Sequence, residues 1–222
     1  RYLLQQGHQV TVLTRRPPAY QGRLMVAKQP EGLDVVRVSS YVMADFGYWQ
    51  RVAMFLSFPL AALFVLRRIR RADVVVVNLG PLPSAIPALA LSWLRRSSLV
   101  VYLADPWLDV VVARGLMPTA WLGHLLKRFE SFILRRADRI ATVSHPMRRV
   151  LIERGLEADT IEVIPGGVDL DQFAPTSDEP DALRRAIGLP QLQGRFVLIY
   201  GGLLGDLVDA ETLLEAAERL KD

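Results

Sequence analysis

The sequence of 222 residues contains no cysteine and only three histidines. Without thiols the chain can form no disulfide, no cysteine nucleophile and no cysteine-ligated zinc site, and three scattered histidines suggest no Ser–His–Asp triad. Long hydrophobic runs are also lacking. The longest, residues 52–66, has 15 residues, whereas a membrane-spanning helix needs about 20. With 51% hydrophobic residues the chain can nevertheless bury a substantial core, which excludes an intrinsically disordered polymer.

Acidic residues are scarce in the first part of the chain. Residues 1–154 contain 22 basic and 9 acidic residues (22 − 9 = +13), whereas residues 155–222 contain 5 basic and 14 acidic residues (5 − 14 = −9). The net charge of +4 therefore conceals two regions that we expect to have different surroundings. The basic part carries no nucleic-acid recognition motif and no interleaved aromatic stripe, so we expect no nucleic-acid partner.

The apolar run 52–66 leads into a basic cluster, Arg67–Arg71. Two interpretations of the segment Val52–Arg71 stay open. One is a buried crossover helix with cations at its C-terminus, where they interact favourably with the helix dipole. The other is an apolar and basic surface that rests on an anionic membrane.

Hydrophobic periodicity predicts an alternation of strands and helices. Gly7 and Gly155 are each placed to end a helix, and the four-valine run 74–77 is typical of a strand covered on both faces. The sequence therefore predicts an α/β fold, a Rossmann-like parallel sheet with flanking helices. The expected strands are 10–13, 33–38, 74–77, 98–104, 139–144 and 160–165, and the expected helices are 52–66, 84–96, 119–136 and 145–154.

The end of the chain predicts a second domain. Residues 175–194 are rich in Pro, Asp and Gly and are typical of a linker. A strand and glycine loop at 195–205 and an amphipathic helix at 208–222 follow. One such unit cannot bury both of its faces, so we expect a first domain over 1–174 and only the start of another over 195–222.

The first candidate site is the segment ADPWLD, which directly follows the predicted strand 98–104. In open parallel sheets, ligands bind beyond the carboxyl ends of the strands. Asp105 and Asp109 could accept hydrogen bonds from sugar hydroxyls, and the Trp107 indole could stack on a sugar face. Alternatively, Asp105 caps the next turn and Trp107 packs inward.

The second candidate is the loop YGGLLG, with Gly201, Gly202 and Gly205 between a strand and a helix. Such glycines allow backbone N–H groups to approach a diphosphate at the helix N-terminus. The alternative is a tight turn without a ligand.

A third segment, VIPGGVDLD, leaves the last strand of the first domain. Gly166 and Gly167 permit a sharp exit toward the linker. Asp169 and Asp171 have the spacing of a divalent-cation pair, but no further ligand lies nearby, so we expect no metal site. Nearby, Ser144 is predicted to be a helix N-cap, with a supporting polar contact as the alternative, and Thr119 is predicted to cap 119–136.

Four segments together resemble the family-4 glycosyltransferases of the GT-B fold, among them the bacterial sugar transferases of the WbuB type. They are 137–155, 161–175, 196–205 and 210–222, and ADPWLD matches a further stretch of that family. Gly166 stands where the family usually has Asn. The family's two donor-binding Glu of the second domain, which have seven residues between them, are absent from this sequence, and we expect the family's first glycine-rich strand to lie before Arg1.

The resemblance implies transfer of a hexose-type sugar from a nucleotide-diphosphate donor to a lipid-linked or saccharide acceptor in cell-surface polysaccharide biosynthesis. It implies retention of anomeric configuration, no cofactor, no obligatory metal and a cytoplasmic location. Peripheral attachment to the inner face of the cytoplasmic membrane is a further expectation. Asp105 would orient or deprotonate the acceptor, and Trp107 and Asp109 would shape its pocket. Gly201, Gly202 and Gly205 would approach the donor diphosphate. Gly166, Gly167 and Asp169 would connect the two domains.

Because both ends of the family's fold are missing, we expect a fragment that transfers no sugar alone. Two alternatives from other classes stay open. One is a non-catalytic, membrane-docking half of a split transferase. The other is a nicotinamide-dependent oxidoreductase, which would need a G-x-G-x-x-G motif in its first strand–helix unit.

Overall fold

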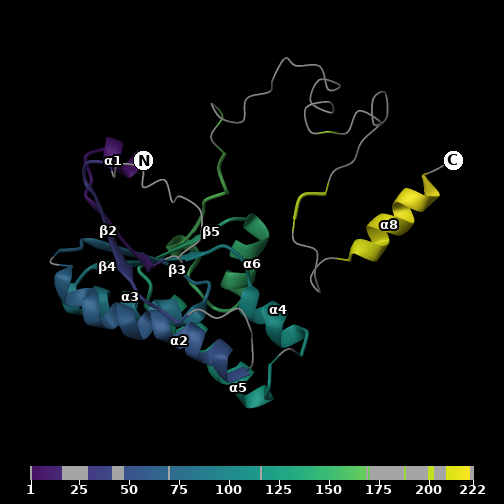
Figure 1. Ribbon diagram of the computed structural model, residues 1–222, viewed down its shortest axis with the longest axis horizontal. Coiled ribbons are helices and arrows are strands. Elements are labelled where there is room, and N and C mark those ends of the chain that lie inside the picture. Colours follow the sequence, from purple (N-terminus) through teal and green to yellow (C-terminus); the bar gives the residue numbers. More distant parts are fainter. Residues whose placement is uncertain are drawn as a thin grey trace. The chain divides into compact units, whose positions relative to one another are not determined.

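In the computed structural model the chain forms two compact units, Arg1–Gly167 and Val168–Asp222, and each is described by itself (Figure 1). The predicted linker 175–194 lies outside the described residues, except for residue 188, and so do Asp169, Asp171 and Gly205. The structure describes residues 2–16, 30–41, 48–69, 71–115, 117–168, 170, 188, 200–202 and 209–220.

The first unit alternates strands and helices, which confirms the predicted α/β class. Its strands are β1 (Val10–Arg15), β2 (Leu33–Val38), β3 (Val74–Asn78), β4 (Ser98–Leu103), β5 (Arg139–Thr142) and β6 (Ile161–Val163). Its α-helices are α1 (Tyr2–Gln5), α2 (Tyr48–Val65), α3 (Ala85–Arg95), α4 (Trp107–Ala113), α5 (Ala120–Arg136) and α6 (His145–Glu153). Short 3-10 turns are η1 (Leu66–Arg68), η2 (Leu82–Ser84) and η3 (Ala158–Thr160).

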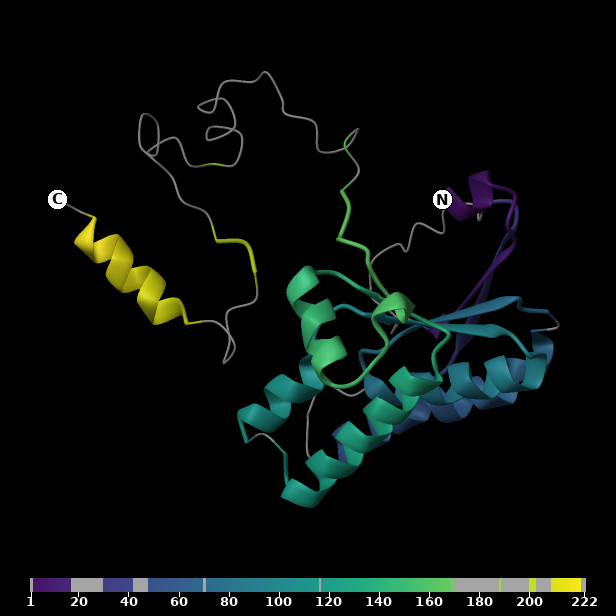
Figure 2. The same ribbon diagram turned by 180° about the vertical axis from the view of Figure 1, so that it is seen from behind.

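The described strands form two parallel sheets. One contains β1 and β2, and the other has the order β3-β4-β5-β6. Strands that follow one another in sequence are neighbours in the larger sheet, and right-handed crossovers then place their helices on the same face. Figures 1 and 2 show α2, α3 and α5 as one layer on that face.

The core lies between this helix layer and the larger sheet. Side chains alternate between the faces of a strand, so Val75 and Val77 are buried whereas Val74 and Val76 are 54% and 66% exposed. The prediction that both faces of 74–77 are covered is therefore wrong for the described part of the chain. Leu99, Val101, Ile133, Ile140 and Leu151 are at most 2% exposed and form the centre of the core.

Two predicted helix ends are confirmed by their backbone geometry. Gly7 and Gly155 have φ of +80° and +81°, a left-handed conformation that glycine adopts without steric cost. The amide of His8 donates to the Leu3 carbonyl at 3.0 Å, and that of Leu156 donates to Leu151 at 3.3 Å. These bonds satisfy carbonyls that the last helical turn would otherwise leave free.

Helix α2 begins at Tyr48, four residues before the predicted start, and contains Pro59. It is buried on one side only, because Ala62 and Leu66 pack into the core whereas Leu60 and Phe64 are exposed. The interpretation of this segment as a buried crossover helix therefore holds for its core-facing side only. None of the helices among the described residues has the length and apolar content needed to cross a bilayer.

Helix α4, Trp107–Ala113, was not predicted. Three consecutive valines, 110–112, favour extended chain when considered locally. Tertiary packing overrides this preference, since Leu108 is 2% exposed and joins the core beneath the sheet. The helix therefore exists because its first turn has a buried contact, which the local sequence does not show.

The two predicted N-caps differ in the structure. Ser144 Oγ accepts a hydrogen bond from the Met147 amide at 3.4 Å, whereas Thr119 occupies the cap position of α5 without a side-chain cap bond. We expect Ser144→Ala to lower the free energy of unfolding by about 1 kcal/mol and Thr119→Ala to change it by only a few tenths. Urea unfolding of both variants measures the difference, and equal losses would show that the Ser144 cap does not stabilise α6.

The described part of the second unit consists of residues 200–202 and helix α8 (Ala210–Arg219). This helix matches the predicted segment 208–222. Asp209 caps it, accepting hydrogen bonds from the Thr212 amide at 3.2 Å and the Thr212 hydroxyl at 2.7 Å. The side-chain bond from Thr212 is the largest cause that lowers the pKa of Asp209 from its ordinary value.

Candidate functional site

The candidate site lies at the carboxyl edge of the larger sheet. Parallel strands all end at the same edge, so the segments that follow β4, β5 and β6 come together there. These segments carry Asp105, then Ser144 and His145, then Gly166 and Gly167. Three stretches singled out in the sequence are thus brought to one edge, although up to 62 residues separate them in the chain (167 − 105 = 62).

Asp105 lies between the end of β4 and the start of α4, and it is exposed. Its carboxylate makes no hydrogen bond or ion pair with another described residue. The N-cap of α4 is Pro106, so the alternative that Asp105 caps this helix does not hold. The carboxylate is therefore free to accept a hydrogen bond or a proton from a ligand.

Trp107 is the first residue of α4 and is 44% exposed. Its ring centroid lies 6.3 Å from that of Phe55 on α2, with an angle of 51° between the ring planes. This tilted contact holds part of the indole against α2. The remaining part is open to solvent and can contact an apolar ligand surface.

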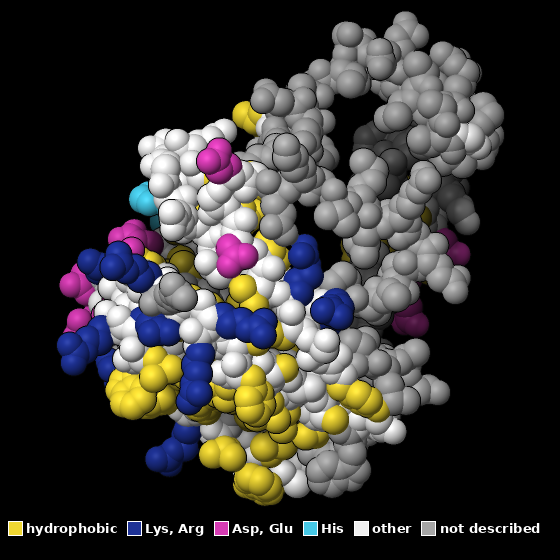
Figure 3. Space-filling model, turned by 60° about the vertical axis from the view of Figure 1, so that its left-hand side comes forward, with side chains coloured by type: hydrophobic (Ala, Val, Ile, Leu, Met, Phe, Trp, Pro, Cys, Tyr) yellow, Lys and Arg dark blue, Asp and Glu magenta, His cyan; other side chains and the backbone are white. Residues whose placement is uncertain are grey.

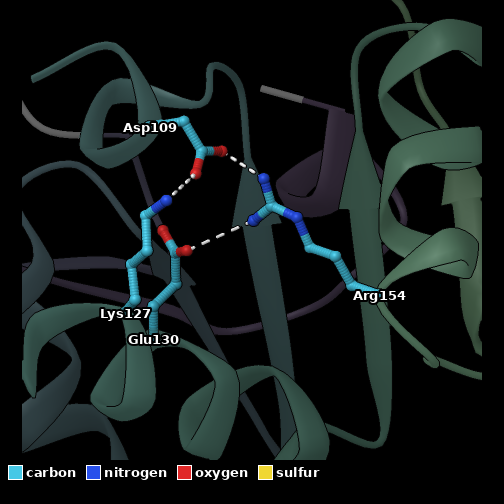
Figure 4. A network of polar contacts seen from close by, with 4 residues as sticks. All are labelled: Asp109, Lys127, Glu130 and Arg154. Carbon is cyan, nitrogen blue, oxygen red and sulfur yellow. Dashed lines mark hydrogen bonds and ion pairs between the residues drawn. The ribbon is translucent and has the colours of Figure 1, made fainter. Parts of the chain in front are cut away.

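Asp109 follows Asp105 by four residues, inside α4, but lies in a different environment. It forms ion pairs with Arg154 and with Lys127, whose Nζ lies 3.3 Å from Asp109 Oδ1 (Figure 4). Arg154 Nη1 also lies 3.4 Å from Glu130 Oε2. The network joins α4 to α5 and to the end of α6, so the Asp109 carboxylate is occupied by cations of the protein itself.

Glu130 is the buried member of this network, at 6% exposure. Burial raises the pKa of its carboxyl above the ordinary value, and the nearby charge of Asp109 raises it further. Arg154 and Lys127 act in the opposite direction and favour the ionised form. Sequence reasoning missed this residue. The sequence feature that could have indicated it is that Glu130 is the one acidic residue on a helix whose other charged residues are basic. Its partner could not be found in this way, because Arg154 lies 24 residues away.

The glycine candidates are distributed between the two units. Gly166 and Gly167 follow β6 and are exposed, and nothing lies within 4 Å of a Cβ built on either. Gly201 also faces open space, whereas a Cβ on Gly202 would lie 2.6 Å from the Tyr200 hydroxyl. Within the described residues, no group of three or more His, Asp or Glu side chains is placed to hold a metal ion.

An open parallel sheet with its candidate site beyond the strand ends defines the Rossmann-like class of ligand-binding folds. Comparison with known proteins identifies the family. Residues 1–167 match the glycosyl transferase 4-like domain, and the chain belongs to this family. A nicotinamide-dependent oxidoreductase therefore has no support.

Curated relatives include two proteins named for glycosyl transfer. The chain is 29% identical over its whole length to the putative colanic acid biosynthesis glycosyl transferase WcaI of Escherichia coli, covering 57% of that protein. It is 25% identical to the probable glycosyltransferase WbjE of Pseudomonas aeruginosa, over 70% of this chain and 38% of that protein. The chain thus spans about half the length of these relatives, or less.

Two solved structures share the fold. A sucrose-phosphate synthase from Thermosynechococcus elongatus superposes with a TM-score of 0.69 at 18% identity, over 99% of this chain and 52% of that one. Anabaena HepE, solved in complex with UDP and glucose, has a TM-score of 0.60 at 14% identity, over 96% and 58%. These likenesses show that the chain has the architecture of the N-terminal part of GT-B glycosyltransferases.

Proposed function

We propose that the protein containing this chain transfers a sugar from a nucleotide-diphosphate donor to a lipid-linked or saccharide acceptor, with retention of configuration. The first unit would hold the acceptor, and the reaction would contribute to a cell-surface polysaccharide. The relative named for colanic acid biosynthesis supports the polysaccharide assignment. A cytoplasmic location and independence of metal belong to the same proposal.

The observation that carries this proposal is the exposed carboxylate of Asp105 at the carboxyl end of β4, which has no partner within the described part of the chain. An acceptor hydroxyl must be oriented and must lose a proton as the new glycosidic bond forms, and a carboxylate within hydrogen-bond reach can do both. Trp107 would stack on the acceptor sugar with its exposed face. Asp109, bound by Arg154 and Lys127, would shape the pocket by fixing the first turns of α4 rather than by touching the acceptor.

Donor binding is assigned to the second domain. Gly201, Gly202 and Gly205 would allow backbone amides to approach the diphosphate, in a proposed domain that starts at residue 195 after the linker 175–194. Gly166, Gly167 and Asp169 would connect the domains. The UDP bound to HepE makes uridine diphosphate sugars the first donors to test. On this proposal the first domain covers residues 1–174 and transfers no sugar without the donor-binding domain.

The test uses the longest natural protein that contains this chain, incubated with UDP-, GDP- and dTDP-sugars and with sugar acceptors. We expect release of nucleoside diphosphate that depends on acceptor and persists in EDTA. NMR of the product should show the anomeric configuration of the donor. Absence of release with every donor, or an inverted product, would contradict the proposal.

A further inference from the structure

We propose that the outward side of the helix layer formed by α2, α3 and α5, here called the outer helix face, binds the surface of an anionic lipid bilayer. The proposal goes beyond sugar transfer and rests on side chains other than those of the candidate acceptor site. Six exposed apolar residues define the face: Leu60, Phe64, Trp93, Trp121, Leu125 and Phe132.

Helix α2 contributes an apolar row that ends in cations. Leu56, Leu60 and Phe64 are spaced four residues apart, which places them on one side of the helix, and Phe64 is 86% exposed. Arg67 and Arg68 follow in the next turn and are exposed as well. On a protein surface that contacts only water, such a row is unfavourable, because its hydrophobic side chains stay in solvent.

Helix α5 shows the same combination along its whole length. Trp121, Leu125 and Phe132 are exposed, and Arg128 and Arg135 lie on the same side at helical spacing. An open depression of about 540 Å³ lies here, lined by His124, Lys127, Arg128, Ser131, Phe132 and Arg135. The guanidinium groups of Arg128 and Arg135 lie on the same side of α5 as the Phe132 ring, a setting suited to a phosphate headgroup above acyl chains, whereas Lys127 is paired with Asp109.

Helix α3 extends the surface at its C-terminal end. Trp93 is 76% exposed, Leu94 is also exposed, and Arg95 and Arg96 follow directly. Helix α3 packs against α2. Figures 1 and 2 show α2, α3 and α5 in one layer, so their outward sides form a common face.

The charge of this face selects an anionic partner. Helices α2, α3 and α5 with η1 contain a single acidic residue, Glu130, and it is buried. In Figure 3 hydrophobic side chains gather at the lower side of the view beside Lys and Arg, while Asp and Glu lie higher. Trp and Phe side chains that lie beside Lys and Arg suit the boundary between lipid headgroups and acyl chains. A bound nucleic acid would contact the cations but leave the exposed leucines in water.

This surface differs from the one predicted from sequence. The segment Val52–Arg71 contributes only the outward side of α2, because Ala62, Leu66 and Ile69 are buried. The larger part comes from α3 and α5, whose exposed tryptophans and phenylalanine the sequence did not assign to any surface. The helices would lie along the bilayer with their apolar side in the interface.

The experiment is flotation of the natural protein with phosphatidylcholine vesicles that contain or lack phosphatidylglycerol. We expect binding only to the anionic vesicles, weakened by salt. Because each basic residue near an anionic surface contributes about five-fold in affinity, Arg128→Gln with Arg135→Gln should weaken binding by about 25-fold. Phe64→Ser with Trp121→Ser should abolish it.

The matched control is Arg15→Gln with Arg37→Gln, exposed arginines of β1 and β2 that change the net charge equally. We expect this control to bind almost as the parent protein does. Equal losses in both arginine pairs, or no flotation of the parent, would overturn the proposal. The proposal would also be overturned if the parent protein were a dimer and the Phe64→Ser variant a monomer, because the face would then be a protein interface. Circular dichroism verifies folding, and transfer to a water-soluble acceptor should be unchanged in all variants.

Discussion

Asp105→Asn is expected to lower kcat of the proposed sugar transfer by about 10²-fold or more, because an amide cannot take up the proton of an acceptor hydroxyl. The substitution keeps the size and much of the hydrogen-bonding capacity of the side chain. Asp105 is exposed and has no partner among the described residues, so we expect no loss of stability. Steady-state kinetics with saturating donor and acceptor measure the effect, and KM for the acceptor should change little.

Asp73→Asn is the matched control for this experiment. Asp73 is also an exposed aspartate beside the larger sheet, but it precedes β3 and therefore lies at the amino edge. It should retain parental kcat. If Asp105→Asn were as active as Asp73→Asn, Asp105 would have no part in proton transfer, and the acceptor site would have to be sought elsewhere on the carboxyl edge.

The second large effect is expected from Arg154→Met, which removes the cation shared by Asp109 and Glu130. Breaking a fully buried ion pair costs about 3–5 kcal/mol, and because the Arg154 side chain is 35% exposed we expect a loss of about 1–3 kcal/mol. Arg149→Met, an exposed residue of the same helix, should change stability little. Urea unfolding at neutral pH compares the two.

The loss in Arg154→Met should depend on pH in a defined direction. The folded-state pKa of Glu130 is already raised, first by burial, and removing Arg154 raises it further. A carboxyl with a raised folded-state pKa is stabilising below its unfolded pKa, and that stability is lost as pH rises through the folded value. The variant should therefore be close to the parent below about pH 4 and weakest near neutrality.

Glu130→Gln in the Arg154→Met background should restore much of the stability at neutral pH, because no buried charge is then left without its partner. A destabilisation of Arg154→Met that is the same at acid and neutral pH would contradict this account. It would show that Arg154 acts through packing of its methylene groups rather than through its charge.

Part of the candidate site was readable from the sequence. The position of Asp105 and Trp107 directly after a buried strand was sufficient to place them at the carboxyl edge, because every parallel strand presents that end to ligands. The ion-paired environment of Asp109 could not be predicted from the sequence. Its partner Arg154 lies 45 residues away, and nothing near either residue specifies their pairing.

The α/β class, the order of the strands in the first unit and the helix ends at Gly7 and Gly155 could be predicted from the sequence alone. Each depends on periodicity or turn chemistry within a few neighbouring residues. The tertiary structure was needed to show that 107–113 is helical, that one face of β3 is exposed, and that Asp109 and Glu130 form ion pairs with Arg154. These features depend on contacts between segments far apart in the chain, and local propensity carries no information about such contacts.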